Sequence, residues 1–179
     1  MTRYAALLGS INVGGNRLAM ADLRAALEAE GFADVATVVA SGNVLFDHPG
    51  EADAALEQRI ASVVQTRFGI DTFAAVRTSA ELEAVLAESP FAGESEDKRV
   101  HVHFLERQPA PEAFARLLAD HEGRGPEQLA PGTRCLHTDY VSNVGHSKLN
   151  GDFIARRLGR RGTARNIRSI RRIIEAMDP

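Results

Sequence analysis

Residues 1–78 alternate between two hydrophobic periodicities. Apolar residues run almost without interruption through residues 3–11 and 72–77, which predicts strands in the interior of a sheet. Between these strands, apolar residues recur at helical spacing around Leu23 and again around Ile60. This spacing predicts two amphipathic helices, each with one face toward the core.

A pair of short strands separates the two predicted helices. Residues 34–40 are rich in β-branched side chains, and residues 43–47 continue the strand pattern directly after Ser41-Gly42. Strands joined by so short a connection pair as an antiparallel hairpin. The predicted order is therefore strand, helix, strand, strand, helix, strand, which is the ferredoxin-like or α/β-plait unit.

Residues 79–179 repeat this order, with one more helix at each end. Thr78 and Glu81 have the spacing of a capping box, which predicts a helix that stops at Ser89-Pro90. The patterns that follow predict a strand at 99–105, a helix from Pro111, a hairpin at 128–130 and 134–140, a helix over 149–158, a short strand near 162–164 and a final helix over 167–177. We expect an α+β protein of two tandem ferredoxin-like units with antiparallel sheets and an additional C-terminal helix, divided into domains at residues 1–78 and 79–179.

Composition indicates the class of protein and its cellular location. Hydrophobic residues make up 44% and charged residues 25% of the chain, as in ordinary globular proteins. A single cysteine excludes an internal disulfide and suits a reducing compartment. No apolar run is long enough for a signal sequence or a membrane span, so we expect a cytoplasmic protein that does not associate with membranes.

Charge is distributed unevenly along the chain. The net charge of −3 combines −9 over residues 1–145 with +6 over residues 146–179. A basic segment of this kind attracts an anionic partner, such as a phosphate-bearing small molecule or a nucleic acid. It also matches an acidic body of the same chain, and both interpretations stay open.

A glycine pair follows the first predicted strand. Gly14 and Gly15 lie where free N–H groups ahead of a helix can hold an anion, and Asn12, Asn16 and Arg17 add side-chain donors. The chain lacks both standard phosphate-loop motifs. The alternative interpretation is a strand-to-helix turn in which glycine supplies a positive φ.

Two long stretches resemble a known bacterial family. The run "INVGGNRLAMADLRAALEAEGFADVATVVASGNVLF" resembles the opening of the domain of unknown function (DUF) family 1697, and "SKLNGDFIARRLGRRGTARNIRSI" resembles its closing pattern. The resemblance implies a tandem α/β-plait fold and no established activity. Where the family usually has Arg-Gly before this first run, the chain has Gly9-Ser10, so Arg17 and Lys148 are the cationic donors we expect to remain.

These features combine into a predicted binding site. We expect the Asn12–Arg17 loop, Ser41–Asn43 and Lys148 to meet in a cleft between the two plaits. The residues assigned to ligand binding are Asn12, Gly14, Gly15, Asn16, Arg17, Ser41, Gly42, Asn43, Ser147, Lys148, Arg165 and Asn166. The favoured function is a binding module for an anionic ligand. A small enzyme that uses the same polar cleft and a structural or oligomerisation module are the alternatives, and no residue is assigned a catalytic role.

The histidines and the cysteine suggest chemistry that we do not favour. His101 and His103 alternate on one predicted strand, and His137 lies on a neighbouring one, which is a candidate metal-ligand arrangement. Cys135 lies two residues before His137, on the same strand face, as a nucleophile beside a base would. Histidines on strands usually pair with polar neighbours, and the flanks of Cys135 match no catalytic cysteine signature, so we expect no metal or cofactor and a buried cysteine that packs as a small hydrophobic residue.

Overall fold

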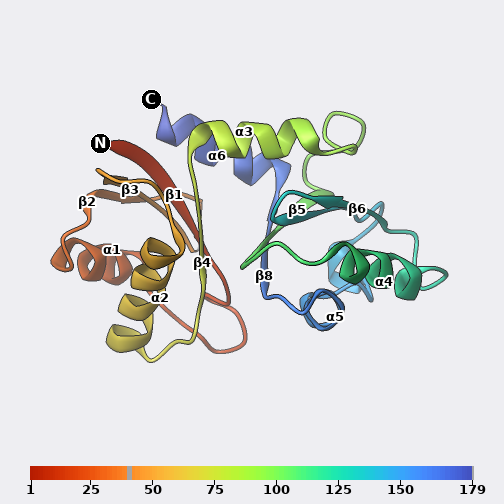
Figure 1. Cartoon of the computed structure of the whole chain (residues 1–179), viewed down its shortest axis with the longest axis horizontal. Coiled ribbons are helices and arrows are strands. Elements are labelled where there is room, and N and C mark those ends of the chain that lie inside the picture. Colours follow the sequence, from red (N-terminus) through yellow and green to blue (C-terminus); the bar gives the residue numbers. More distant parts are fainter. Residues whose placement is uncertain (40–41, 179) are drawn as a thin grey trace. The chain divides into compact units, whose positions relative to one another are not determined.

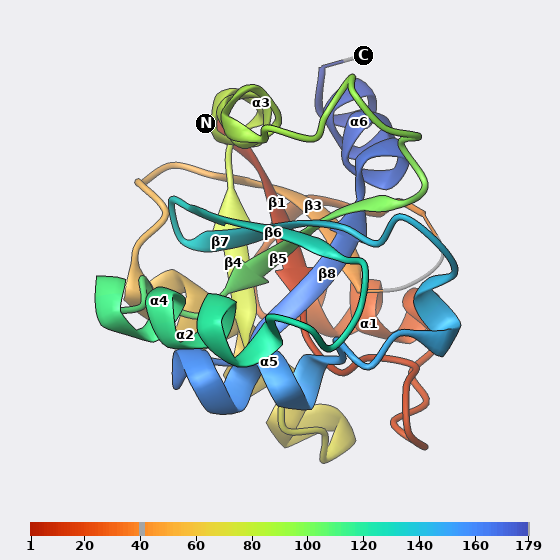
Figure 2. The same ribbon diagram turned by 90° about the vertical axis from the view of Figure 1, so that its right-hand side faces the viewer.

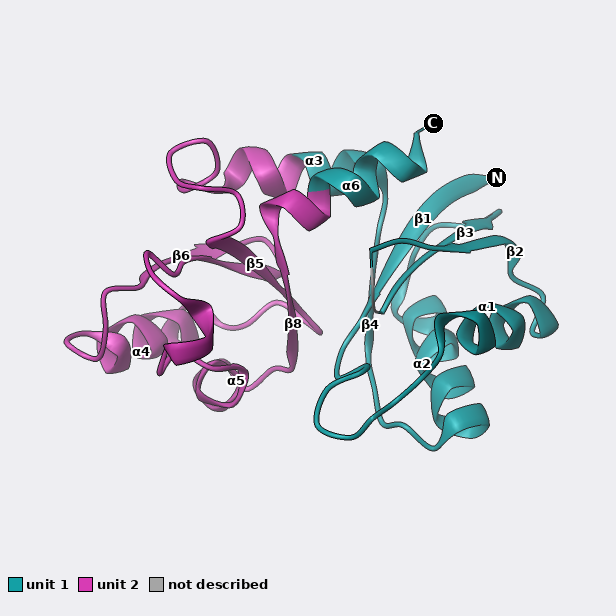
Figure 3. Cartoon of the chain, turned by 180° about the vertical axis from the view of Figure 1, so that it is seen from behind, with its two compact units in different colours: residues 1–83, 171–179 teal, residues 84–170 magenta. Residues whose placement is uncertain are grey.

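The computed structural model describes residues 1–39 and 42–178. Within them the protein is a mixed α+β chain with two four-stranded antiparallel sheets and six α-helices. Figure 1 shows the elements in chain order, and Figure 3 shows the two compact units, Met1–Glu83 with Arg171–Pro179, and Ala84–Ile170.

The first unit contains one sheet and two helices that pack on it. Its strands lie in the order β2-β3-β1-β4 with antiparallel neighbours throughout. The elements are β1 (Thr2–Leu8), α1 (Met20–Ala29), β2 (Ala33–Thr37), β3 (Asn43–His48), α2 (Ala54–Phe68) and β4 (Ala74–Arg77).

Alternation along β1 separates its two faces. Tyr4, Ala6 and Leu8 belong to the core that also contains Leu23 of α1 and Ile60 of α2. Each helix therefore buries its apolar stripe against this face of the sheet, as the helical periodicity predicted.

The ends of α2 follow from local chemistry. The Asp53 side chain accepts a hydrogen bond from the Leu56 N–H at 2.8 Å and so caps the first turn. Gly69 ends the helix with φ of 69°, a left-handed conformation that favours glycine.

The second unit contains the other sheet, in the order β6-β7-β5-β8. Its elements are α3 (Ser79–Glu88), β5 (Val100–Leu105), α4 (Pro111–His121), β6 (Gln128–Gly132), β7 (Cys135–Asp139), the 3₁₀ turn η1 (Val144–His146), α5 (Gly151–Leu158), β8 (Gly162–Asn166) and α6 (Ile167–Met177). The division between the units falls within α3 and within α6, so each of these helices belongs partly to the first unit. In Figure 2, α4 and α5 lie side by side along one face of this sheet.

The two faces of the second sheet differ in what they carry. Leu105 and Leu136 face the core formed with α4 and α5. Because side chains alternate along a strand, Cys135 and His137 of β7 point to the opposite face. That face carries the site described below.

The predicted elements are all present within a few residues of their expected limits. The capping box at the start of α3 is confirmed, since the Glu81 carboxylate accepts from the Thr78 N–H at 2.7 Å and the Thr78 hydroxyl accepts from the Glu81 N–H at 3.2 Å. None of the helices in residues 1–39 and 42–178 combines the length and apolar character needed to cross a bilayer.

Candidate functional site

The glycine loop between β1 and α1 is closed by its own asparagine. The Asn12 side chain accepts from the Leu18 N–H at 2.8 Å and donates to the Leu18 carbonyl at 3.0 Å. Asn12 itself has φ of 56°, a conformation that asparagine tolerates better than most residues. This amide therefore holds the two ends of the loop together.

The rest of the loop is organised in the same way. The Asn16 side chain donates to the Ser10 carbonyl at 3.1 Å, and the Arg17 N–H donates to the Gly15 carbonyl at 2.9 Å. Gly14 has φ of 57° and Gly15 φ of 94°, so both need the freedom of glycine. These contacts support the turn interpretation, while the Arg17 side chain lies exposed.

The second predicted segment is also engaged in local structure. Asn43 is 2% exposed, and its side chain donates to the carbonyls of Val38 and Val39, both at 3.1 Å. Gly42 has φ of 72°, as its place in the turn predicts. Ser41 lies outside the described residues.

The C-terminal candidates hold a loop and a helix end in place. The Ser147 hydroxyl donates to the Glu127 carboxylate and accepts from the Leu149 N–H at 3.0 Å. The Asn166 side chain accepts from the Ser169 N–H at 2.8 Å and so caps α6.

Arg165 and Lys148 differ in burial. The Arg165 guanidinium donates to the Thr163 hydroxyl at 2.7 Å and to the Ala164 carbonyl at 2.9 Å, and burial lowers its pKa to about 10. Lys148 is exposed. The Asn12–Arg17 loop belongs to the first unit and both of these residues to the second, so their convergence in one cleft stays a prediction.

The histidine trio considered from the sequence does not share a face. The pairing of His103 with Leu136 and of Val102 with His137 places His103 and His137 on opposite sides of the sheet. His101 alternates with Val102 and lies on the His103 side. The three rings therefore cannot ligate one ion.

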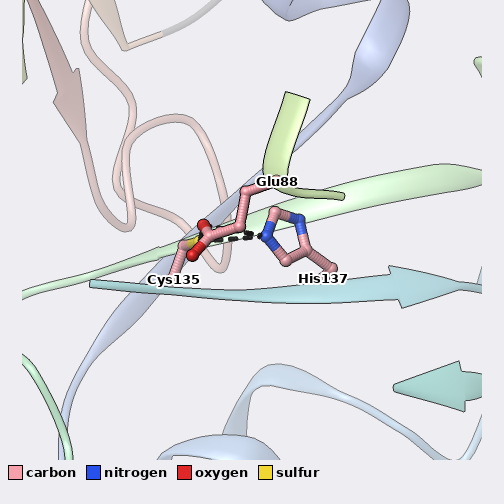
Figure 4. Close-up of side chains that lie close together, drawn as sticks. All are labelled: Glu88, Cys135 and His137. Atoms are coloured by element: carbon pink, nitrogen blue, oxygen red, sulfur yellow. Dashed lines mark hydrogen bonds and ion pairs between the residues drawn. The ribbon is translucent and has the colours of Figure 1, made fainter. Parts of the chain in front are cut away.

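A different cluster forms on the other face of this sheet. Glu88, from the last position of α3, points toward Cys135 and His137 of β7 (Figure 4). The Sγ of Cys135 lies 3.5 Å from Nε2 of His137 and 3.7 Å from Oε2 of Glu88, and the last two atoms are 3.3 Å apart. We name these three residues the ECH cluster; within the described part of the chain, it is the one group of three metal-ligating side chains this close together.

Thr133 fixes the carboxylate of the cluster. Its N–H donates to both carboxylate oxygens of Glu88, at 3.0 Å to Oε1 and 3.1 Å to Oε2, and its hydroxyl donates to Oε1 at 2.8 Å. Oε2 also faces the other two residues of the cluster. Burial raises the pKa of Glu88, but the hydrogen bonds from Thr133 and the contact with His137 outweigh it and lower that pKa overall. The carboxylate is therefore ionised at neutral pH.

The imidazole of the cluster is neutral. Burial lowers the pKa of His137 against the opposing effect of the Glu88 carboxylate. Cys135 and His137 are both 0% exposed, whereas the Glu88 side chain is 34% exposed. The cluster thus has a buried floor and one solvent-accessible edge.

The backbone of Gly132 lies directly against the three ligand atoms. A Cβ at this position would lie 2.5 Å from Sγ of Cys135, 2.7 Å from Nε2 of His137 and 2.9 Å from Oε2 of Glu88. The φ of Gly132 does not lie in the left-handed region, so the backbone conformation does not require glycine there. Glycine is required there because the three side chains approach so closely.

The arrangement is not that of a catalytic triad. In a triad, the base contacts the nucleophile through one ring nitrogen and the acid through the other. Here Cys135 and Glu88 both contact Nε2 of His137, while the buried Nδ1 has no hydrogen-bond partner among the described residues. Convergence on one point is instead the geometry of ligands around an ion.

Comparison with known protein families gives a match that covers most of the chain. A family model described as "Protein of unknown function (DUF1697)" matches residues 1–137. The chain belongs to this family. The DUF1697 match contains the glycine loop and extends through all three residues of the ECH cluster.

One solved structure resembles the whole DUF1697 chain. It is the "conserved bacterial protein SP0830 from Streptococcus pneumoniae", with 22% identity and a TM-score of 0.77, and the alignment covers 100% of this chain and 99% of that one. At this identity the likeness extends to the fold alone. A search of curated proteins finds no match.

Sequence reasoning identified two members of the ECH cluster and missed the third. The period of two along β7 places Cys135 and His137 on one face, as predicted. Glu88 ends a helix 47 residues before Cys135, and nothing in its local pattern marks it. Gly132 is the last residue of β6, next to the turn residues Thr133 and Arg134, where a glycine is ordinary, so no local signal in the sequence marks the site.

Proposed function

We propose that this DUF1697 protein binds a divalent metal ion of the zinc class through Glu88, Cys135 and His137. This differs from the expectation, drawn from the sequence, that the chain binds no metal. The observation that carries the proposal is the set of distances between the three ligand atoms.

Those distances match tetrahedral coordination. Zinc binds thiolate sulfur at about 2.3 Å, imidazole nitrogen at about 2.0–2.1 Å and carboxylate oxygen at about 2.0–2.2 Å. With tetrahedral angles, these lengths place sulfur about 3.5–3.6 Å from both nitrogen and oxygen, and nitrogen about 3.3–3.4 Å from oxygen. The corresponding distances in the ECH cluster are 3.5, 3.7 and 3.3 Å.

Hydrogen bonding alone accounts less well for the cluster. A thiol and a neutral imidazole supply two protons, but the three atoms make three mutual contacts. A metal ion placed among them satisfies all three. The hydrogen bonds from Thr133 to Glu88 are the outer-shell support that ligating carboxylates commonly have.

Zinc titration tests this proposal. The metal-free protein is expected to bind one equivalent of Zn²⁺ in competition with a chromophoric chelator, and Zn²⁺ at about 100 times Kd should stabilise the fold by about 2.7 kcal/mol. Glu88→Gln, which keeps its size and an oxygen that accepts from Thr133, should weaken binding by more than the roughly 10- to 100-fold lost when an outer-shell partner is removed, because Glu88 is itself a proposed ligand.

Two matched variants serve as controls. Glu83→Gln removes an exposed carboxylate from the same helix, and His101→Gln removes a histidine from the opposite face of the sheet. Both should bind Zn²⁺ like the parent protein. Equal losses in Glu83→Gln and Glu88→Gln, or no binding by the parent, contradict the proposal.

The anionic-ligand function is a second proposal. Arg17 and Lys148 are exposed, and neither makes an ion pair with a described residue. Each charged contact with an anion contributes roughly 1.5–3 kcal/mol. Arg17→Ala and Lys148→Ala should therefore each weaken binding of inorganic phosphate or single-stranded RNA about tenfold or more, with folding stability changed by under ~0.5 kcal/mol.

Salt dependence and a control complete that test. Binding of RNA through phosphates must weaken steeply with salt, whereas binding of a small ligand does so less. Lys98→Ala removes an exposed lysine that pairs with Glu96 and should leave affinity unchanged. Lost stability with unchanged affinity would assign Arg17 and Lys148 to structure.

The assignment of the two sheets to ferredoxin-like units is also a proposal. The order of elements and strands in each sheet supports two ferredoxin-like units, with domains at residues 1–78 and 79–179 and with α3 and α6 as additional helices. A thiolate ligand requires a reduced cysteine, which supports a cytoplasmic location.

A further inference from the structure

A cavity of about 330 Å³ adjoins the ECH cluster. Its walls come from the end of α3, from the first turn of α4 with the two residues before Ala110, and from the end of β6, all within the second unit. The lining residues are Glu88, Gln108, Pro109, Pro111, Phe114, Pro131 and Gly132. Of these, Glu88 belongs to the ECH cluster, and Gly132 lies against its three ligand atoms.

The cavity lies beside the exposed edge of the cluster. Cys135 and His137 are fully buried, so neither offers an approach from solvent. The Glu88 side chain is 34% exposed, and Gly132 is half-buried. Because these two residues also line the cavity, it borders the solvent-accessible edge of the cluster.

The coordination shell is one ligand short. Tetrahedral structural zinc sites have four protein ligands, whereas sites that exchange ligands have three and leave one position for water or substrate. Within residues 1–39 and 42–178, the group of converging metal-ligating side chains has three members. The ECH cluster therefore has the composition of an exchangeable site.

We infer that the fourth coordination position takes the oxygen-donor head group of a small ligand whose apolar body lies in this cavity. The inference rests on the proposed metal site and adds the class of ligand. The head group is a carboxylate or a similar oxygen donor, because zinc accepts oxygen readily.

The walls determine the body of the ligand. Pro109, Pro111, Phe114 and Pro131 present apolar surface, and the polar contribution comes from Glu88 and Gln108. Oε1 of Gln108 already accepts from the Arg134 N–H at 2.5 Å, which fixes this amide at the edge. A few placed polar groups in a mostly apolar wall are typical of small-molecule sites.

Volume sets the size of that body. A cavity of about 150 Å³ admits one benzene ring, so a cavity of this volume holds roughly two. The ligand class is therefore a small aryl or branched-alkyl carboxylate, up to the size of a fused bicyclic ring.

Hydroxamates on the cobalt-substituted protein test this inference. Hydroxamates bind metals through oxygen, and the visible spectrum of bound Co²⁺ reports a change in its ligands. Naphthohydroxamate is expected to change the spectrum and to bind at least about tenfold tighter than acetohydroxamate, since only the former buries rings in the cavity.

Variants of α4 connect this preference to the cavity. Phe114→Leu shortens one wall and should reduce the preference for the naphthyl compound at least about threefold. Leu118→Ala, on the same helix, removes an exposed side chain that is not part of the lining and should leave the preference unchanged.

The outcomes separate the two claims. Failure of the protein to bind Co²⁺ or Zn²⁺ overturns the proposed function itself. Stoichiometric Co²⁺ binding with no spectral response to either hydroxamate, or with equal affinity for both, leaves the metal site intact and overturns this inference.

Discussion

Gly132→Ala is expected to lower the affinity for Zn²⁺ at least about 1,000-fold, equivalent to ~4 kcal/mol of binding free energy. The added Cβ would lie between 2.5 and 2.9 Å from all three ligand atoms, too close for them to stay in place, so it would force the ligands out of their tetrahedral arrangement. Competition titration with a chromophoric chelator measures the effect.

The same methyl group also affects folding. Because a Cβ 2.5 Å from the buried Sγ of Cys135 forces side chains apart, the metal-free variant should lose about 1–3 kcal/mol of unfolding free energy. Thermal unfolding and circular dichroism establish that the variant is folded before its zinc affinity is compared.

Gly151→Ala is the matched control. Gly151 belongs to the same unit, its φ is not left-handed, and no atom lies within 4 Å of the added Cβ. This variant should bind Zn²⁺ like the parent. A folded Gly132→Ala protein with parental zinc affinity would contradict the metal site.

The second large effect concerns the pH dependence of stability. His103 is fully buried on the α4 and α5 side of the sheet, and burial, with smaller contributions from His101 and His137, lowers its pKa to about 3. Its Nε2 lies 3.3 Å from the hydroxyls of both Thr138 and Tyr140. These neutral groups provide no charge to stabilise an imidazolium ion.

The direction of the effect follows from linkage. The folded-state pKa lies below the ordinary value of 6.5, so the unfolded chain binds this proton more tightly than the folded protein does. Stability is therefore complete above pH 6.5 and is lost as pH falls from there toward pH 3. Between pH 7 and pH 4, His103 should cost about 3 kcal/mol of unfolding free energy.

Urea unfolding at intervals from pH 7 to pH 4 measures this loss. His103→Gln removes the titrating group, so its stability should fall about 3 kcal/mol less than that of the parent over this range. His146→Gln removes an exposed histidine from the same unit and should retain the parental pH dependence. Parallel curves for the parent and His103→Gln would contradict the assignment.

Local sequence signals determined most of the secondary structure. Helical spacing around Leu23 and Ile60 placed α1 and α2, and the capping box at Thr78 placed the start of α3. These features depend on neighbours within a few residues, where side-chain periodicity and backbone donors are sufficient to specify a helix. The period of two along β7 likewise determined that Cys135 and His137 share a face.

Contacts between distant segments were decided only by tertiary structure. The pairing of β5 with β7 separated His103 from His137, so the histidine trio suggested by the sequence is wrong. Packing of the end of α3 brought Glu88 to the Cys135 side of the sheet, and close approach of β6 placed Gly132 among the ligand atoms. Spacing along the sequence does not predict such contacts, because they depend on how whole helices and strands pack.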